Sequence, residues 1–187
     1  MTNSESTINR RTFLSKTAAV VAGGSALAKT ALSYGKILGA NDRIALCHVG
    51  IGGRGTELDL IVSKVAPSHN VEMNAVCDLW SLNREKAVAT NTKYYNRAPR
   101  AFQHIEDVLE DKDIDALILS TPDHSHSSLL KMTADAGKDA YVEKPMGNVL
   151  SEAKSARDAV LKNKLIVQVG TQHRSEPYPR AAHDLVQ

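Results

Sequence analysis

The sequence predicts an α/β fold in which helices cover a parallel sheet, and three features of the 187-residue chain indicate it. Short apolar runs alternate with helical segments at the spacing of βαβ units. A glycine-rich loop joins the first apolar run to the first helix. Polar residues gather where several predicted strands end. Hydrophobic residues make up 42% of the chain, which is ordinary for a globular protein and enough for one sizeable domain.

The strands are predicted from apolar runs and the helices from the segments between them. Residues 53–65 carry apolar side chains at i, i+3, i+4 and i+7, which is the spacing of one helix face. We interpret the following segment, 66–70, as a longer turn. The remaining helices are predicted over 81–94, 104–110, 151–163 and a segment that ends at 136. The predicted strands are residues 43–49, 71–77, 101–102, 114–120, 139–143 and 165–170.

The first 31 residues are predicted to be a twin-arginine export signal. The pair Arg10-Arg11 precedes an apolar run of small residues over 17–28, which ends in the small-x-small pattern of a cleavage site. This run is too short and too rich in glycine and alanine to span a bilayer, so we expect cleavage near residue 28 and no stable membrane anchor. We expect a periplasmic protein that uses the twin-arginine export machinery, with a linker over 32–41. A chance arginine pair in a basic tail is the alternative.

Charge and cysteine content argue against several kinds of site. The formal net charge is +2 and falls to zero without residues 1–28, so nothing indicates a nucleic-acid-binding surface. Cys47 and Cys77 lie in strand-like runs and are interpreted as buried thiols, with no disulfide framework and no CxxC metal site. His124 and His126 form an H-x-H pair without a third and fourth ligand at a recognisable spacing, so we predict no metal site.

The loop after the first strand has the pattern G-x-G-x-x-G at Gly50, Gly52 and Gly55. It follows a predicted strand and opens a helix, which is the context of a dinucleotide-binding loop in a Rossmann-type, doubly wound sheet. The N-terminus of the helix offers N–H groups and a partial positive charge to a pyrophosphate. A glycine-rich turn without a ligand is the alternative. We assign the whole loop to cofactor binding, which includes Ile51, Gly53 and Arg54, and predict a dinucleotide-binding domain over 42–175.

Asp78 ends the second predicted strand, where an acid that binds the ribose of a dinucleotide is expected. It lies 26 residues after Gly52, and the turn predicted over 66–70 accounts for a distance longer than the usual ~20 residues. A carboxylate there accepts hydrogen bonds from the ribose diol and repels a 2′-phosphate, which favours NAD over NADP. Arg84 lies close enough in the sequence to leave NADP possible. A role of Asp78 as a helix cap is the alternative.

Polar side chains also follow the fourth, fifth and sixth predicted strands, over residues 120–126, 143–146 and 170–175. Because the carboxyl ends of parallel strands meet at one edge of the sheet, we expect these residues to form one site. Taken singly, each has a structural alternative. Asp123 is a plausible helix cap, and Glu143 with Lys144 is a plausible solvated charge pair.

Three motifs together, Gly-x-Gly-Gly-Arg-Gly, Thr-Pro-Asp-His-Ser-His and Glu-Lys-Pro-Met, resemble the glucose–fructose oxidoreductase, inositol dehydrogenase and rhizopine catabolism family, and the resemblance extends from about residue 42 to the end. It implies an NAD(P)-dependent oxidoreductase in which Lys144 lies beside the nicotinamide and the reacting carbinol. Many members carry Asn in place of Asp123, so we give Asp123 no role. The cofactor-binding residues that the resemblance implies at this edge are Ser120, Thr121, Pro122, His126, Glu143, Lys144, Pro145 and Gln172.

The resemblance also implies a second, α+β substrate domain that supplies a catalytic histidine and forms homo-oligomers. We expect residues 176–187 to be only its beginning, and the substrate to be a sugar or polyol. Lys144 suits the stabilisation of a forming alkoxide, because an ammonium is a compact positive charge. One alternative is an NAD-dependent glycosidase on the same scaffold, against which the Glu-Lys-Pro element counts. The other is a nucleotide-binding sensor without turnover, against which Lys144 and the export signal count.

Overall fold

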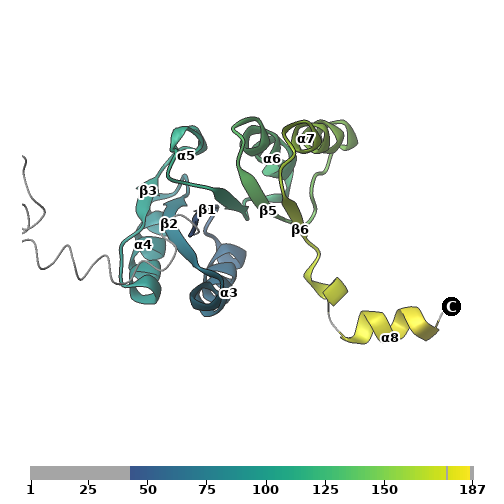
Figure 1. Cartoon of the computed structure of the whole chain (residues 1–187), viewed down its shortest axis with the longest axis horizontal. Helices are drawn as coiled ribbons and strands as arrows, with labels where there is room; N and C mark the ends of the chain where they lie inside the picture. Colours follow the sequence, from purple (N-terminus) through teal and green to yellow (C-terminus); the bar gives the residue numbers. More distant parts are fainter. Residues whose placement is uncertain (1–42, 176, 186–187) are drawn as a thin grey trace, which may run out of the picture. The chain divides into compact units, whose positions relative to one another are not determined.

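The computed structural model describes residues 43–175 and 177–185, and the predicted export signal (1–31) and linker (32–41) lie outside them. Six parallel strands form one sheet in the order β3-β2-β1-β4-β5-β6 (Figure 1). The strands are β1 (Ile44–Val49), β2 (Val71–Cys77), β3 (Arg100–Phe102), β4 (Ala116–Leu119), β5 (Asp139–Glu143) and β6 (Val167–Gly170). The α-helices are α3 (Gly53–His69), α4 (Ser81–Tyr95), α5 (Ile105–Glu110), α6 (His126–Asp135), α7 (Leu150–Asn163) and α8 (Pro177–Leu185), and the 3-10 helices are η1 (Asp123–Ser125) and η2 (Gln172–Ser175).

The predicted Rossmann-type, doubly wound parallel sheet is confirmed, and its two faces carry two separate hydrophobic cores. On one face, strand residues such as Val49 and Leu119 pack with the helices α5, α6 and α7. On the other face, Met73 and Ile118 pack with residues of α3 and α4, among them Leu58. Successive strand residues point to opposite faces, so a strand that is covered on both faces is apolar along its whole length.

The connections leave β1 and β4 in opposite directions, which creates the topological switch point of the sheet. From β1 the chain continues through α3 to β2 on one side, whereas β4 continues through α6 to β5 on the other. In open α/β sheets, ligands bind at the carboxyl ends of the strands beside such a point. The predicted site residues therefore lie at the carboxyl edge of the sheet beside the switch point, where ligands bind in this class of fold.

The turn predicted over 66–70 is wrong, because α3 continues to His69 and only Asn70 leaves the helix. Asn70 has a left-handed conformation, and its N–H closes the helix on the carbonyl of Ala66. Ala66 is buried, and the last turn stays helical although Pro67 removes one donor. The long distance from Gly52 to Asp78 thus comes from a longer helix.

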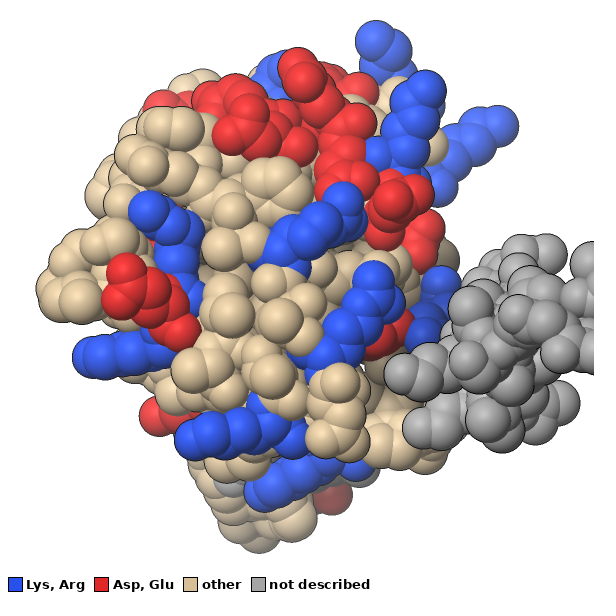
Figure 2. Space-filling model, turned by 90° about the vertical axis from the view of Figure 1, so that its left-hand side faces the viewer, with Lys and Arg blue, Asp and Glu red and all other residues tan. Residues whose placement is uncertain are grey.

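Other boundaries differ by a few residues. The fourth and sixth strands are shorter than predicted, and η1 precedes the helix that ends at Asp135. Within the described residues, no helix has the length and apolar character that a membrane crossing needs. On the face drawn in Figure 2, basic and acidic side chains are interspersed.

Candidate functional site

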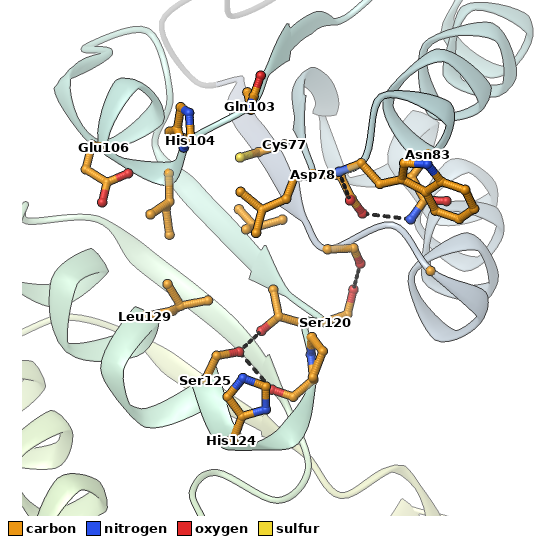
Figure 3. A pocket seen from close by; sticks show the side chains of 18 residues that line it. Cys77, Asp78, Asn83, Gln103, His104, Glu106, Ser120, His124, Ser125 and Leu129 are labelled. Carbon is orange, nitrogen blue, oxygen red and sulfur yellow. Dashed lines mark hydrogen bonds between the residues drawn. The ribbon is translucent and has the colours of Figure 1, made fainter.

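A pocket of about 790 Å³ opens at the carboxyl ends of β1, β2 and β4 (Figure 3). It brings together six residues that were predicted from the sequence, namely Gly50, Gly52, Asp78, Ser120, Thr121 and Pro122. Most residues that line the rest of this pocket were not predicted. Among these are Trp80, Asn83, Gln103, His104 and Glu106. His124, which also lines it, lies in the predicted segment 120–126. Gln103 and His104 directly follow β3. Residues at the carboxyl ends of parallel strands are expected at the ligand site, so the short third strand was the signal that could have identified both.

Two glycines of the loop at 50–55 occupy positions that no other residue fits. Gly50 has φ +84°, and a Cβ there would lie 2.7 Å from the backbone nitrogen of Thr121. A Cβ on Gly55 would overlap the carbonyl oxygen of Gly50. A Cβ on Gly52, by contrast, would meet no atom within 4 Å and would point into open space. The loop therefore packs tightly on β4 while it leaves its outer side open to a ligand, as a pyrophosphate requires.

The carboxylate of Asp78 holds the loop and the start of α4 together. Its Oδ2 accepts hydrogen bonds from the backbone N–H of Ile51 (2.8 Å) and from Asn83 (3.1 Å), and its Oδ1 accepts one from the backbone N–H of Trp80 (2.9 Å). A carboxylate has about four acceptor positions, so one remains for a ligand. The cap role that was left open as an alternative is not observed, because the N-cap of α4 is Trp80 and no side chain caps this helix. Asp78 holds the turn before α4, which is compatible with the binding of a ribose hydroxyl.

The guanidinium of Arg84 donates to the backbone carbonyls of Asp78 (2.6 Å) and Leu79 (3.0 Å). Both bonds involve Nη1, so the side chain is held along the end of β2. This arrangement uses Arg84 to stabilise the turn between β2 and α4.

A second pocket, of about 340 Å³, lies around Lys144 and shares Ser120 and Thr121 with the first. Its lining also includes Arg54 of the glycine loop, the exposed Lys144 and Gln172. The Oε1 atom of Gln172 is buried and has no hydrogen-bond partner within the described residues. Such an orphaned acceptor suits a hydroxyl or amide donor from a bound group, because an unpaired buried acceptor is costly.

The buried carboxylate of Glu143 connects this pocket to the glycine loop. Its Oε1 accepts hydrogen bonds from Nε of Arg54 (2.8 Å) and from the hydroxyl of Tyr141 (3.1 Å), and its Oε2 accepts one from the backbone N–H of Lys144 (3.2 Å). Arg54 also pairs with Glu57 at 3.0 Å. Burial, and then the negative charge of Glu143, raise the pKa of Tyr141 above its ordinary value, so its hydroxyl stays a donor.

His126 links the loops that follow β4 and β5. Its Nδ1 lies 2.7 Å from the carbonyl oxygen of Pro145, and its Nε2 lies 2.8 Å from that of Thr121. Carbonyl oxygens only accept, so a ring nitrogen that carries a proton donates to one of these two carbonyls. The side chain belongs to the wall of the second pocket but is only 1% exposed.

Four of the residues assigned to cofactor binding line neither of these two pockets, namely Ile51, Gly53, Gly55 and Pro145. Ile51 packs its side chain into the core beside α3 and α4. The Lys144–Pro145 peptide bond is cis, and the carbonyl of Pro145 faces His126. Within the part of the chain that the structure describes, no group of three His, Cys, Asp or Glu side chains is placed to hold a metal ion.

Comparison with known proteins places this site in a family context. Residues 47–171 match the sequence model of the oxidoreductase family with an NAD-binding Rossmann fold. Scyllo-inositol 2-dehydrogenase (NAD(+)) of Bacillus subtilis is 41% identical over 71 residues, which are 38% of this chain and 21% of that protein. A glycosyl hydrolase family 109 protein of Shewanella sp. (strain W3-18-1) is 29% identical over 164 residues, 78% of this chain and 35% of that protein.

Solved structures show the same fold. The scyllo-inositol dehydrogenase of Lactobacillus casei, solved with NAD(H) and scyllo-inositol, superimposes with a TM-score of 0.66 at 21% identity, over 77% of this chain and 41% of that protein. The chain spans between about a fifth and two fifths of the length of these relatives.

Proposed function

We propose that this chain, which belongs to the oxidoreductase family with an NAD-binding Rossmann fold, serves hydride transfer between a nicotinamide cofactor and a sugar, polyol or related carbinol. One observation carries the proposal. The ammonium group of Lys144 lies at the carboxyl end of β5, in a pocket that also contains Arg54 of the glycine loop and two residues of the larger pocket. A dinucleotide held by the loop can therefore reach the position where Lys144 meets a substrate.

The residues fit the two halves of a dinucleotide. The N–H groups at the start of α3 suit the pyrophosphate, and the open acceptor position of Asp78 suits a ribose hydroxyl. Thr121, Pro122 and Gln172 lie toward the nicotinamide half. The bound nicotinamide supplies the hydride acceptor or donor.

Lys144 is free to act on the substrate oxygen because its neighbour is already neutralised. Glu143 is paired with Arg54, and within the described residues no carboxylate pairs with Nζ of Lys144. An ammonium beside a carbinol oxygen stabilises the negative charge that develops on it as the hydride leaves, and it can take up or release the hydroxyl proton. Lys144 is thus the proposed catalytic residue.

We infer a preference for NAD over NADP. The carboxylate of Asp78 would repel a 2′-phosphate, and Arg84 is engaged with two backbone carbonyls. Trp80 is the only tryptophan of the sequence and lines the larger pocket, so its fluorescence reports binding without background. Titration of the 187-residue chain should show saturable quenching by NAD at lower concentration than by NADP. Tighter binding of NADP, or no response to either dinucleotide, would overturn the assignment.

A second candidate is an NAD-dependent glycosidase, which the match to the Shewanella glycosyl hydrolase family 109 protein over 78% of the chain supports. The Glu-Lys-Pro element at 143–145 favours the oxidoreductase over the glycosidase. A substrate screen separates the two. Stoichiometric NADH formation from free polyols supports hydride transfer as the net reaction, whereas release of an aryl leaving group without net NADH supports the glycosidase.

A further inference from the structure

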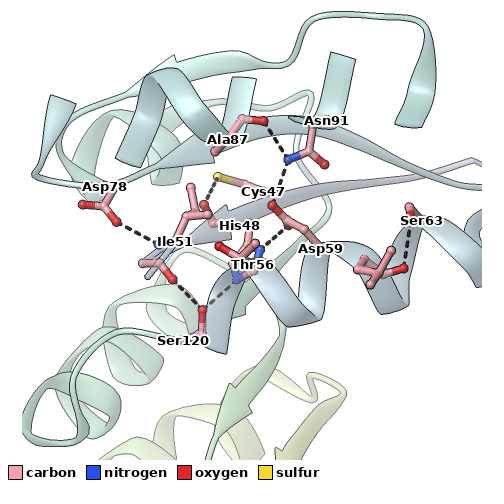
Figure 4. Close-up of polar contacts among 12 residues, drawn as sticks. Cys47, His48, Ile51, Thr56, Asp59, Ser63, Asp78, Ala87, Asn91 and Ser120 are labelled. Atoms are coloured by element: carbon pink, nitrogen blue, oxygen red, sulfur yellow. Dashed lines mark hydrogen bonds and ion pairs between the residues drawn. The ribbon is translucent and has the colours of Figure 1, made fainter. Parts of the chain in front are cut away.

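A chain of buried polar side chains runs beneath the glycine loop, and of its members only Ser120 belongs to the site described above (Figure 4). Asn91 of α4 donates to Oδ2 of Asp59 on α3 (2.9 Å), and Oδ1 of Asp59 lies 2.5 Å from Nδ1 of His48 on β1. Nε2 of His48 lies 2.7 Å from the hydroxyl of Ser120, which donates to the carbonyl of Gly50 (2.6 Å). The first three residues are at most 1% exposed.

The contacts of Ser120 determine where the protons lie. The carbonyl of Gly50 can only accept, so the single hydroxyl proton of Ser120 points to it. The hydroxyl oxygen must then accept from His48, which places a proton on Nε2. A second proton lies between Nδ1 and the carboxylate of Asp59, and together the two groups form a neutral pair that needs no further counter-charge. The direction of every hydrogen bond in the chain is thereby fixed.

The far end of this chain is the peptide group between Gly50 and Ile51. Its carbonyl accepts from Ser120, and its N–H donates to Asp78 (2.8 Å). The same carbonyl oxygen fills the space that a Cβ on Gly55 would need. The Gly50–Ile51 peptide is therefore held on one side by Ser120, which follows β4, and on the other side by Asp78, which follows β2. A rotation of this plane would redirect the loop that faces the pyrophosphate.

We propose that His48 is a positioning residue for the cofactor, which acts through the hydroxyl of Ser120 to fix the orientation of the Gly50–Ile51 peptide. The inference rests on the proposed function, since its consequence is measured as NAD affinity. Other polar groups near the pair are Asn91 and the hydroxyl of Tyr95, which both lie on α4. Burial, and then the charge of Asp59, raise the pKa of Tyr95 to about 12, so this hydroxyl stays neutral. Within the described residues, Asp59 is the one carboxylate that forms a hydrogen bond or ion pair with His48.

The substitution His48→Asn tests the positioning role while it keeps a donor for the buried carboxylate. Its amide nitrogen can take the position of Nδ1 and donate to Oδ1 of Asp59, but the shorter side chain leaves no group at the position of Nε2. Ser120 then loses the donor that orients its hydroxyl toward the carbonyl of Gly50. Asn91 keeps its bonds to Asp59 and to the carbonyl of Ala87. The core therefore keeps its polar contacts while the loop loses one fixed contact.

The experiment combines nitrogen NMR of the imidazoles with NAD titration by Trp80 fluorescence on the 187-residue chain. In the unsubstituted protein, His48 should show two protonated ring nitrogens, with its signals assigned by their loss in His48→Gln. In Asp59→Asn the new amide oxygen should accept from Asn91 and the amide nitrogen should donate to Nδ1, so only Nε2 should remain protonated. His48→Asn and Ser120→Ala should each weaken NAD binding on the order of tenfold. The double variant should also lose about tenfold and not a hundredfold, because both changes act through one hydroxyl.

Thr133→Val is the control, since the buried hydroxyl of Thr133 donates to the carbonyl of Leu129 in the same helix, and its loss should leave NAD affinity unchanged. A bare Nε2 in the unsubstituted protein, an unchanged affinity in His48→Asn, or multiplicative losses would each overturn the proposal. If His48→Asn does not fold, the NMR signature of the unsubstituted protein and the affinity of Ser120→Ala still decide. A failure of the unsubstituted chain to bind NAD would refute the proposed function and the positioning role, whereas the NMR signature would still test the proton arrangement.

Discussion

Two glycines of the same loop should respond to alanine in opposite ways, because the structure places them in opposite surroundings. In Gly55→Ala the new methyl group would overlap the carbonyl oxygen of Gly50 and lie 3.0 Å from Oγ of Ser120. Backbone cannot yield as a flexible side chain does, so this overpacking should cost about 1–3 kcal/mol of folding free energy. For a domain of this size, that corresponds to a fall in Tm of roughly 2–12 °C.

Gly52→Ala should leave the fold intact and block the cofactor. No atom lies within 4 Å of the new methyl group, and Gly52 has a negative φ of −77°, so stability should change by less than about 0.5 kcal/mol. The methyl group projects into the pocket where the pyrophosphate would approach the backbone, and NAD affinity should fall at least about tenfold. Thermal unfolding and Trp80 fluorescence titration measure both quantities. Unchanged NAD affinity in Gly52→Ala would refute the placement of the pyrophosphate on this loop.

Three further outcomes are expected. In an enzyme preparation that turns over, Lys144→Ala should slow single-turnover hydride transfer on the order of 10²–10³-fold with little change in NAD affinity, and a near-normal rate would show Lys144 to be only a surface charge. Burial, and then the charge of Asp78, raise the pKa of the Cys77 thiol from 9.0 to about 12, so folding keeps this thiol neutral. The stability of the folded state should therefore fall as the pH rises from 9.0 to about 12, and in Cys77→Ala the free energy of unfolding should depend less on pH in this interval. Changing Arg10 and Arg11 to lysine should abolish export of a reporter that folds before transport, and continued export would exclude the twin-arginine route.

Local sequence patterns were sufficient to predict the sheet and the conformation of the glycine loop. The glycine loop, the strand ends and Asp78 are each recognised from a short stretch, since strand termini and loop conformation depend on neighbouring residues. The predicted end of α3 was wrong for the opposite reason. Pro67 indicates a break, but α3 continues to His69 and its last turn is partly buried at Ala66, and such burial depends on distant segments that a local pattern does not contain.

Contacts between distant residues could not be predicted in this way. Arg54 and Glu143 are 89 positions apart, and His48 and Ser120 are 72 apart. Each of these residues has an ordinary interpretation in its own segment, as a loop cation, a strand acid, a core histidine or a strand-end hydroxyl. Their chemistry appears only when the parallel strands bring the segments to one edge of the sheet.

The two cations near the second pocket show why this spatial pairing matters for function. Arg54 and Lys144 both line the pocket, and Glu143 is adjacent to Lys144 in the sequence. The side chain of Glu143 nevertheless pairs with Arg54 and receives a third bond from the backbone N–H of Lys144. Arg54 thereby neutralises the buried acid and ties the glycine loop to the end of β5. Within the described residues no carboxylate pairs with the ammonium of Lys144, so in the proposed reaction a residue of the glycine loop leaves Lys144 available to the substrate oxygen.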